Sequence, residues 1–277
     1  MKADRAKQVM ASRQAAGFRS FKRVLRLGRQ PLIGGWITLA HPAIAEILGK
    51  AGFDWLAIDL EHSVISFREA EELIRVIVLC GSTPLVRLSA NDPVQIKRVM
   101  DAGAHGVIVP MVNSRSDAQR AVAAVYYPPR GTRGVGLARA QGYGAQFDTY
   151  RRWLDREPVV IVQIEHRDAV QHFRDIVTVP GVDGYLLGSY DISASMGVPG
   201  QLTHPKVTAA LAQVRRLARQ LKVPGGMHVI QPDPREVKRR IREGFQLIAY
   251  SLDILLLGAT AREGLAVVRD GLKRYKA

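Results

Sequence analysis

The chain has 277 residues, of which 47% are hydrophobic and 23% are charged, and this balance excludes an intrinsically disordered protein. No apolar stretch approaches the roughly 18 residues that a transmembrane helix requires. The single cysteine, Cys80, excludes a disulfide-bonded scaffold and fits a reducing, cytoplasmic setting. The formal net charge is +15, but no aromatic-plus-basic strand motif accompanies it, so we expect a basic solvated exterior and no nucleic-acid partner.

The predicted elements begin with a basic extension over residues 1–30, in which Phe18, Phe21 and Leu25 indicate a short amphipathic helix packed on the domain. Residues 31–277 form one catalytic domain in which short apolar strands alternate with helices. Strands are expected at 32–39, 54–59, 83–88, 106–112, 158–165, 184–191, 225–230 and 246–252. Helices are expected at 42–51, 66–80, 92–102, 114–126, 167–177, 205–222, 233–243 and 259–274.

These eight strand–helix units indicate an α/β fold, a (β/α)₈ TIM barrel, because strands that are apolar on both faces and are each followed by a helix are typical of parallel sheets. A doubly wound open sheet is the alternative, but the glycine fingerprint that usually follows its first strand is absent. The glycine-rich stretch 131–136 follows a helix instead, and we interpret it as an active-site loop. Arg130, Arg133 and Arg139 on this loop either meet an anionic or polyhydroxylated substrate or are solvated.

Ionisable residues gather where four of the predicted strands end, which is the catalytic face of such a barrel. Glu165 and Asp191 would lie on neighbouring strands, about 4.8 Å apart, and would repel each other unless a proton, an arginine or a divalent cation lay between them. Oxygen ligands with open positions suit Mg²⁺ or Mn²⁺. A salt-bridged structural rim is the alternative interpretation.

Two further strand ends carry groups suited to proton transfer and to anion binding. His62 follows Asp59 by three residues, so the carboxylate could orient the imidazole; a surface histidine is the alternative. Arg87 lies in an apolar strand and needs a partner, for which a substrate carboxylate or a developing oxyanion is suitable. His228 is interpreted as a satisfied interior group. No predicted strand contains the lysine that a Schiff-base aldolase requires.

Several ordered motifs include these residues: Gly34-Gly35-Trp36, Asp59-Leu60-Glu61-His62, Val86-Arg87, Asp101-Ala102-Gly103-Ala104, Val109-Pro110-Met111-Val112, Gln163-Ile164-Glu165 and Gly188-Ser189-Tyr190-Asp191. With them the chain resembles the metal-dependent class II pyruvate aldolases of the HpcH/HpaI family, from Phe21 to the carboxyl terminus. The resemblance implies a carbon–carbon lyase that cleaves or forms a 4-hydroxy-2-oxo acid through a pyruvate enolate, with a small 2-oxo acid and an aldehyde as its partners.

The resemblance also implies a role for each matching residue. Glu165 and Asp191 match the ligands of a divalent metal (Mg²⁺, Mn²⁺ or Co²⁺), and Arg87 matches the arginine that holds the keto oxygen. His62, paired with Asp59, matches a proton-transfer group, and Asp101 matches an acid that reaches a neighbouring subunit's site. The substrate-binding positions are Gln163, Trp36, Ser189 and Tyr190. The last two depart from the family, whose members often have Gly-Pro-Ala-Asp or Gly-Pro-Ser-Asp where this chain has Gly188-Ser189-Tyr190-Asp191. A homo-oligomer, a hexamer or a trimer, with an exchanged last helix is implied as well.

Two alternatives to the aldolase remain open at this point. Other enolpyruvate chemistry on the same site, such as oxaloacetate decarboxylation or a macrophomate-synthase-like reaction, requires the same residues. A non-enzymatic basic barrel that binds nucleic acid would instead make the acids at the rim structural.

Overall fold

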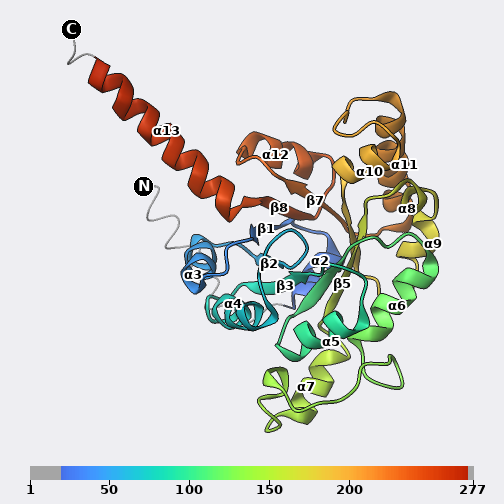
Figure 1. Cartoon of the computed structure of the whole chain (residues 1–277). Helices are drawn as coiled ribbons and strands as arrows, with labels where there is room; N and C mark the ends of the chain where they lie inside the picture. Colours follow the sequence, from blue (N-terminus) through green and yellow to red (C-terminus); the bar gives the residue numbers. More distant parts are fainter. Residues whose placement is uncertain (1–19, 274–277) are drawn as a thin grey trace.

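The computed structural model describes residues 20–273 and contains a closed barrel of eight parallel strands in chain order, which confirms the predicted (β/α)₈ fold (Figure 1). The strands are β1 (Leu32–Ile37), β2 (Trp55–Asp59), β3 (Thr83–Arg87), β4 (Gly106–Val109), β5 (Val159–Ile164), β6 (Gly184–Leu187), β7 (Gly225–Val229) and β8 (Leu247–Leu252). The helices around them are α3 (Pro42–Ala51), α4 (Phe67–Leu79), α5 (Pro93–Asp101), α6 (Arg115–Val125), α8 (Arg167–Gln171), α9 (Phe173–Val177), α11 (Pro205–Leu221) and α12 (Pro234–Arg242).

Two apolar clusters hold the barrel together. One lies between the strands and the surrounding helices, and the other fills the interior with Trp36, Trp55, Leu85, Ile108 and further side chains. Such a filled interior is a packed core rather than a channel. Gly34 is required here, because a Cβ at this position would lie 2.1 Å from the Trp55 ring.

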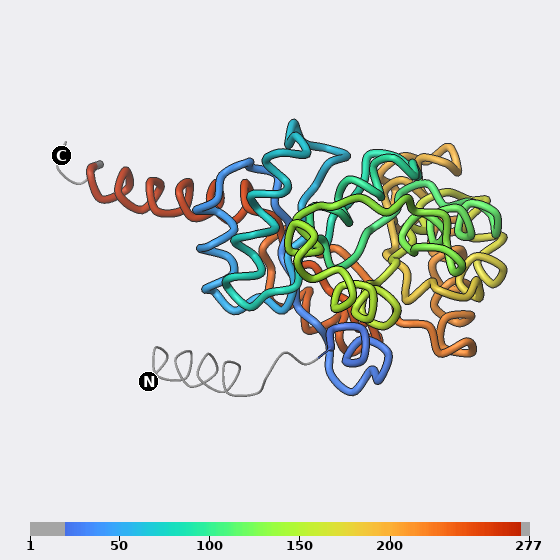
Figure 2. Tube along the Cα trace, turned by 90° about the horizontal axis from the view of Figure 1, so that it is seen from below, coloured from blue at the N-terminus to red at the C-terminus, as the bar shows by residue number. Residues whose placement is uncertain are grey.

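The amino-terminal helix α2 (Phe21–Leu27) closes the end of the barrel at which the strands begin (Figures 1 and 2). Leu25 is part of the interior cluster, and Phe21 and Val24 pack against it. The part of the predicted extension that precedes Ser20 lies outside the described residues.

Several elements differ from the prediction. The sixth strand ends at Leu187, and residues expected to continue it form the helix α10 (Ser189–Ser195). The helix expected at 167–177 is interrupted at His172, whose φ of −94° and ψ of 15° end α8 before α9 begins. The long loop after α6 contains a 3₁₀ turn, η1 (Arg139–Gln141), and the helix α7 (Phe147–Leu154).

The last helix, α13 (Asp253–Lys273), begins six residues earlier than expected and runs away from the barrel (Figures 1 and 2). Several of its apolar side chains are exposed, among them Leu257, Leu265, Val268 and Leu272. Between residues 20 and 273, none of the helices is both long and apolar enough to cross a membrane.

Candidate active site

Arg87 is the centre of an acid–base cluster at the carboxyl ends of β2 and β3. The register pairs Asp59 with Arg87 across these strands, so their side chains meet. Arg87 Nη2 lies 2.5 Å from Asp59 Oδ2 and Nε lies 3.0 Å from Oδ1, which is a bidentate pair. Arg87 Nη1 also lies 3.1 Å from Glu61 Oε2. The guanidinium is therefore held in one orientation, with its charge at the mouth of the barrel.

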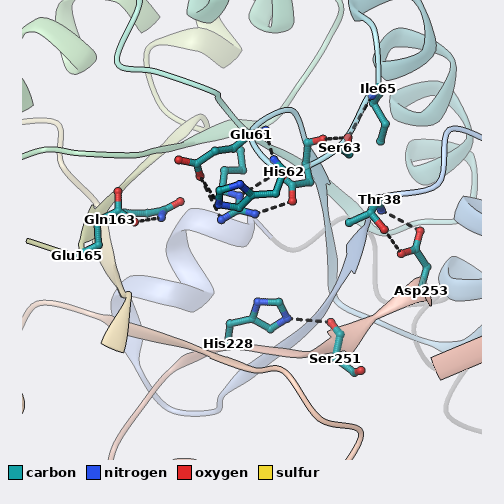
Figure 3. Close-up of polar contacts among 12 residues, drawn as sticks. Thr38, Glu61, His62, Ser63, Ile65, Gln163, Glu165, His228, Ser251 and Asp253 are labelled. Carbon is teal, nitrogen blue, oxygen red and sulfur yellow. Dashed lines mark hydrogen bonds and ion pairs between the residues drawn. The ribbon is translucent and has the colours of Figure 1, made fainter. Parts of the chain in front are cut away.

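Asp59 orients Arg87 rather than the imidazole of His62, so the predicted pairing of the ring with Asp59 is wrong. Asp59 Oδ1 accepts a hydrogen bond of 3.1 Å from the backbone N–H of His62, whereas the ring lies 3.8 Å from Glu61 Oε2 and is 69% exposed (Figure 3). Burial raises the pKa of Asp59, but the Arg87 guanidinium and two backbone N–H groups outweigh this effect and hold the pKa below its usual range. Asp59 is thus an ionised anchor.

Glu61 is a site residue to which the sequence analysis assigned no role. Burial raises its pKa; Arg87 opposes this, but Glu165, Asp59 and Asp191 raise it further, to about 7. A carboxyl group that titrates near neutral pH at the rim of a barrel is suited to proton transfer.

Glu165 follows β5 directly and is held by two donors. Its Oε1 accepts from the backbone N–H of Met111 at 2.6 Å, and its Oε2 accepts from Gln163 Nε2 at 2.5 Å (Figure 3). Burial raises the pKa of Glu165, and the negative charge of Asp191 adds to this effect. The other atom of the Gln163 amide, Oε1, is buried and accepts no hydrogen bond within the described part of the chain.

Asp191 lies in the first turn of α10, and not on a strand as predicted, and its carboxylate lies close to that of Glu165. Between them is Gly188, at which a Cβ would lie 2.7 Å from Glu165 Cβ and 3.4 Å from both Asp191 Oδ2 and Glu165 Oε2. Only glycine therefore allows the start of α10 to pack this closely on Glu165, and this close packing brings the two carboxylates together. Ser189 and the half-exposed Tyr190 precede Asp191 on this turn. Among residues 20–273, no three His, Cys, Asp or Glu side chains are grouped so that they alone could hold a metal ion.

Trp36 and His228 form the opposite wall of the mouth. The two rings stack with centroids 4.8 Å apart, and the Arg87 guanidinium lies 4.9 Å from the Trp36 centroid. His228 Nε2 is 3.1 Å from the carbonyl oxygen of Ser251, which can only accept, so this nitrogen carries the proton (Figure 3). Burial lowers the pKa of His228 to about 4, and the ring is neutral at physiological pH. Its Nδ1 is then an acceptor.

Asp101 and the loop after α6 lie at the other end of the barrel. Asp101 ends α5, and this helix leads into the start of β4. Asp101 Oδ1 pairs with the buried Arg133 at 3.0 Å, while Arg130 and Arg139 donate to the backbone carbonyls of Asp155 and Ala102. The prediction that this loop borders the mouth of its own barrel is therefore wrong, because segments that follow a helix meet the amino-terminal ends of the strands.

Comparison with known proteins gives the same family. The model of the HpcH/HpaI aldolase/citrate lyase family matches residues 32–258. A hydroxypyruvate/pyruvate aldolase of Sagittula stellata is 39% identical over 87% of this chain and 94% of that protein. A 4-hydroxy-2-oxo-heptane-1,7-dioate aldolase of Escherichia coli is 40% identical over 89% and 93%. The crystal structure of a family member from Burkholderia cenocepacia has a TM-score of 0.86 at 35% identity and covers 90% of this chain and 99% of that one. The chain belongs to the HpcH/HpaI aldolase/citrate lyase family.

Proposed function

We propose that this protein is an aldolase, a carbon–carbon lyase that cleaves or forms a 4-hydroxy-2-oxo acid and releases pyruvate and an aldehyde. The observation that carries the proposal is the approach of Glu165 and Asp191 to each other at Gly188, on the rim that also presents Arg87. The two relatives that are named as aldolases support the same class of reaction.

The residues at Gly188 fit a divalent cation. Glu165 Oε2 and Asp191 Oδ2 supply oxygen, which Mg²⁺ and Mn²⁺ prefer, and Gln163 Oε1 is a buried acceptor that no donor among the described residues reaches. Two carboxylates leave positions open for the oxygens of a 2-oxo acid. When bound, the cation acts as a Lewis acid and lowers the free energy of an enolate.

Arg87 and its neighbours supply the remaining electrostatics. The guanidinium, fixed by Asp59, places a positive charge beside the oxygen on which the enolate charge develops. In the cleavage direction, the C4 hydroxyl must lose a proton as the carbon–carbon bond breaks. Glu61 and the exposed His62 lie together at this rim, 3.8 Å apart, and are the groups that accept it and exchange it with solvent.

His228 gives the site a polar contact for the substrate. Its Nδ1 is an acceptor, and the ring is held by Trp36 on one face and by the Ser251 carbonyl at its edge. A hydroxyl group on the substrate could donate to this nitrogen, whereas an unsubstituted carbon could not. We therefore expect His228 to favour hydroxylated substrates.

The experiment that tests the function measures pyruvate released from a 4-hydroxy-2-oxo acid, with Mg²⁺ or Mn²⁺ and with EDTA. We expect Glu165→Gln and Asp191→Asn to lower the metal-dependent rate by about 100-fold or more, since each removes a charge at the reacting centre. The matched control is Glu157→Gln, since Glu157 precedes β5 at the other end of the barrel, and we expect this variant to keep full activity. Deuterium exchange into C3 of pyruvate tests enolate formation alone.

Two results would contradict the proposal. Full activity in either carboxylate variant would remove the two acids from the chemistry. Pyruvate release from oxaloacetate, with no cleavage of any 4-hydroxy-2-oxo acid, would identify a decarboxylase that uses the same enolate.

We further propose that α13 packs on a second copy of this chain. Its exposed Leu257, Leu265, Val268 and Leu272 are spaced so that they share one face of the helix. Asp101 lies far from the mouth of its own barrel, so it could act only at the site of a neighbouring subunit, which is the role that the family resemblance implies. Both features support a homo-oligomer, either a trimer or a hexamer.

A further inference from the structure

A second candidate site lies at the end of the barrel opposite the catalytic mouth. A cavity of about 360 Å³ opens there between α2, the end of α11 and the segments that lead into β7 and β8. Arg26, Arg215, Arg219 and Lys222 line it, and Glu243 is the single acid among the described residues that do so. Its size lies within the range of small-molecule sites.

Positive charge exceeds negative charge on the side of the cavity formed by α2. Asp183 is completely buried and is shared by two cations, with Lys22 Nζ at 3.0 Å and Arg26 Nη2 at 2.7 Å. One carboxylate neutralises only one of them, and the Arg26 side chain, which is 55% exposed, retains donors that face the cavity.

The same imbalance holds on the side formed by α11. Glu243 is shared between Arg240 at 3.0 Å and Arg215 at 3.9 Å, a distance at which the second pair is weak. Within the part of the chain that the structure describes, neither Arg219 nor Lys222 forms an ion pair, although Arg219 Nη2 donates to the backbone carbonyl of Glu243 at 3.0 Å. The positive charges of Arg215, Arg219 and Lys222 repel one another, and a bound anion would relieve this repulsion.

Two residues that line the cavity, Arg215 and Tyr185, carry further hydrogen-bond donors. Arg215 Nε is buried and donates to no acceptor among the described residues. Burial raises the pKa of Tyr185, although Arg215 and Arg219 oppose this, so its hydroxyl stays protonated at neutral pH. Guanidinium groups bind phosphate and carboxylate oxygens in a planar, bidentate manner.

We propose that this cavity, lined by Arg26, Arg215, Arg219 and Lys222, binds a small, multiply charged oxyanion, the phosphate group or the paired carboxylates of a metabolite. A concave site with convergent donors suits a small ligand, whereas a nucleic acid requires an extended basic surface. The site is separate from the aldolase site and does not depend on its assignment.

The test uses isothermal titration of the full chain with inorganic phosphate and, separately, with citrate, in EDTA and at a constant ionic strength set with sodium chloride. The variants are Arg219→Gln and Lys222→Asn; asparagine tolerates the left-handed conformation in which Lys222 ends α11. Arg216→Gln, one residue from Arg215 on the exposed side of α11, is the matched control with the same change of charge. Arg87→Gln reports binding in the catalytic mouth, and circular dichroism confirms that each variant is folded.

We expect one site per chain that binds either anion with a dissociation constant in the millimolar range or below. The affinity should fall at least tenfold in both cavity variants and should be unchanged in Arg216→Gln. Binding of phosphate alone or of citrate alone also supports the site and identifies the class of anion. The proposal is overturned if neither anion binds. It is also overturned if Arg216→Gln weakens anion binding as much as the cavity variants do, or if only Arg87→Gln weakens it. Tighter, steeply salt-dependent binding of a short DNA duplex that is lost in the same variants would replace the small ligand with a nucleic acid.

Discussion

Glu61→Gln tests how the negative charge of Glu61 affects the free energy of unfolding while leaving the packing of the catalytic rim almost unchanged. The substitution keeps the size of the side chain and mimics the protonated carboxyl group. Burial and the charges of Glu165, Asp59 and Asp191 raise the pKa of Glu61 to about 7 despite Arg87, and the side chain is only 18% exposed. Replacing it therefore removes a charge that the folded protein disfavours.

The size and the sign of the effect follow from linkage. A pKa that rises from 4.5 to about 7 on folding means that the folded protein binds more protons than the unfolded chain between these two pH values. Stability is therefore lost as the pH rises through this window. At about 1.4 kcal/mol per pH unit, the loss reaches about 3 kcal/mol by pH 8 and is below about 1 kcal/mol at pH 5. Glu61→Gln should recover this free energy at pH 8.

Urea unfolding at pH 5 and pH 8, in EDTA, measures the difference. The control is Glu72→Gln on the exposed surface of α4, for which we expect less than about 0.5 kcal/mol at both pH values. Added Mg²⁺ should reduce the difference in unfolding free energy between Glu61→Gln and the parent at pH 8, because a cation beside Glu165 and Asp191 offsets their repulsion of Glu61. The reasoning is refuted if Glu61→Gln is no more stable than the parent at pH 8, or if its gain is the same at both pH values.

Three other predictions concern the mouth and the last helix. Asp253 accepts from the amide and the hydroxyl of Thr38 at 2.8 and 2.6 Å, so Asp253→Asn should lower the free energy of unfolding in urea by about 2–3 kcal/mol. His228→Leu should lower kcat/KM about tenfold for substrates with a hydroxyl group that reaches Nδ1 and leave unhydroxylated analogues unaffected; an equal loss for both would exclude the contact. Leu265→Glu on α13 should shift the protein to a smaller species in size-exclusion chromatography, whereas Arg262→Glu on the same helix should not.

The barrel was predictable because its local signals agree with its topology. The Ser66 side chain accepts from the Glu69 amide, and the Glu69 carboxylate accepts from the Ser66 amide, so the Ser-x-x-Glu pattern of residues 66–69 forms a capping box at the start of α4. The sixth strand was predicted too long, because Gly188, Ser189, Tyr190 and Asp191 follow the apolar run of the strand without a helix signal. Gly188, which precedes α10, has no side chain that could act as a cap.

The sequence predicts those features of the site that depend on strand order. It does not predict those that depend on how deeply a side chain is buried. Asp59 and Arg87 end neighbouring strands in register, so their proximity follows from the fold. The raised pKa of Glu61 depends on charges from three other segments and on the depth of the side chain, and neither has a local signature. The position of Arg133 could have been predicted correctly, because a loop between a helix and the next strand must lie at the amino-terminal end of the barrel.

At the catalytic end of the barrel, two strained backbone positions lie beside site residues. Met111 and Ser251, at φ values of 51° and 58°, are non-glycine residues in the left-handed region, which costs about 1–2 kcal/mol each. Each makes a hydrogen bond to a site residue: the Met111 N–H donates to Glu165, and the Ser251 carbonyl accepts from His228. Within residues 20–273, the other two non-glycine residues with a positive φ, Tyr143 and Lys222, lie at the opposite end. The barrel therefore tolerates strain where a backbone group must point at a side chain in the mouth, and neither methionine nor serine reveals such a position in a sequence.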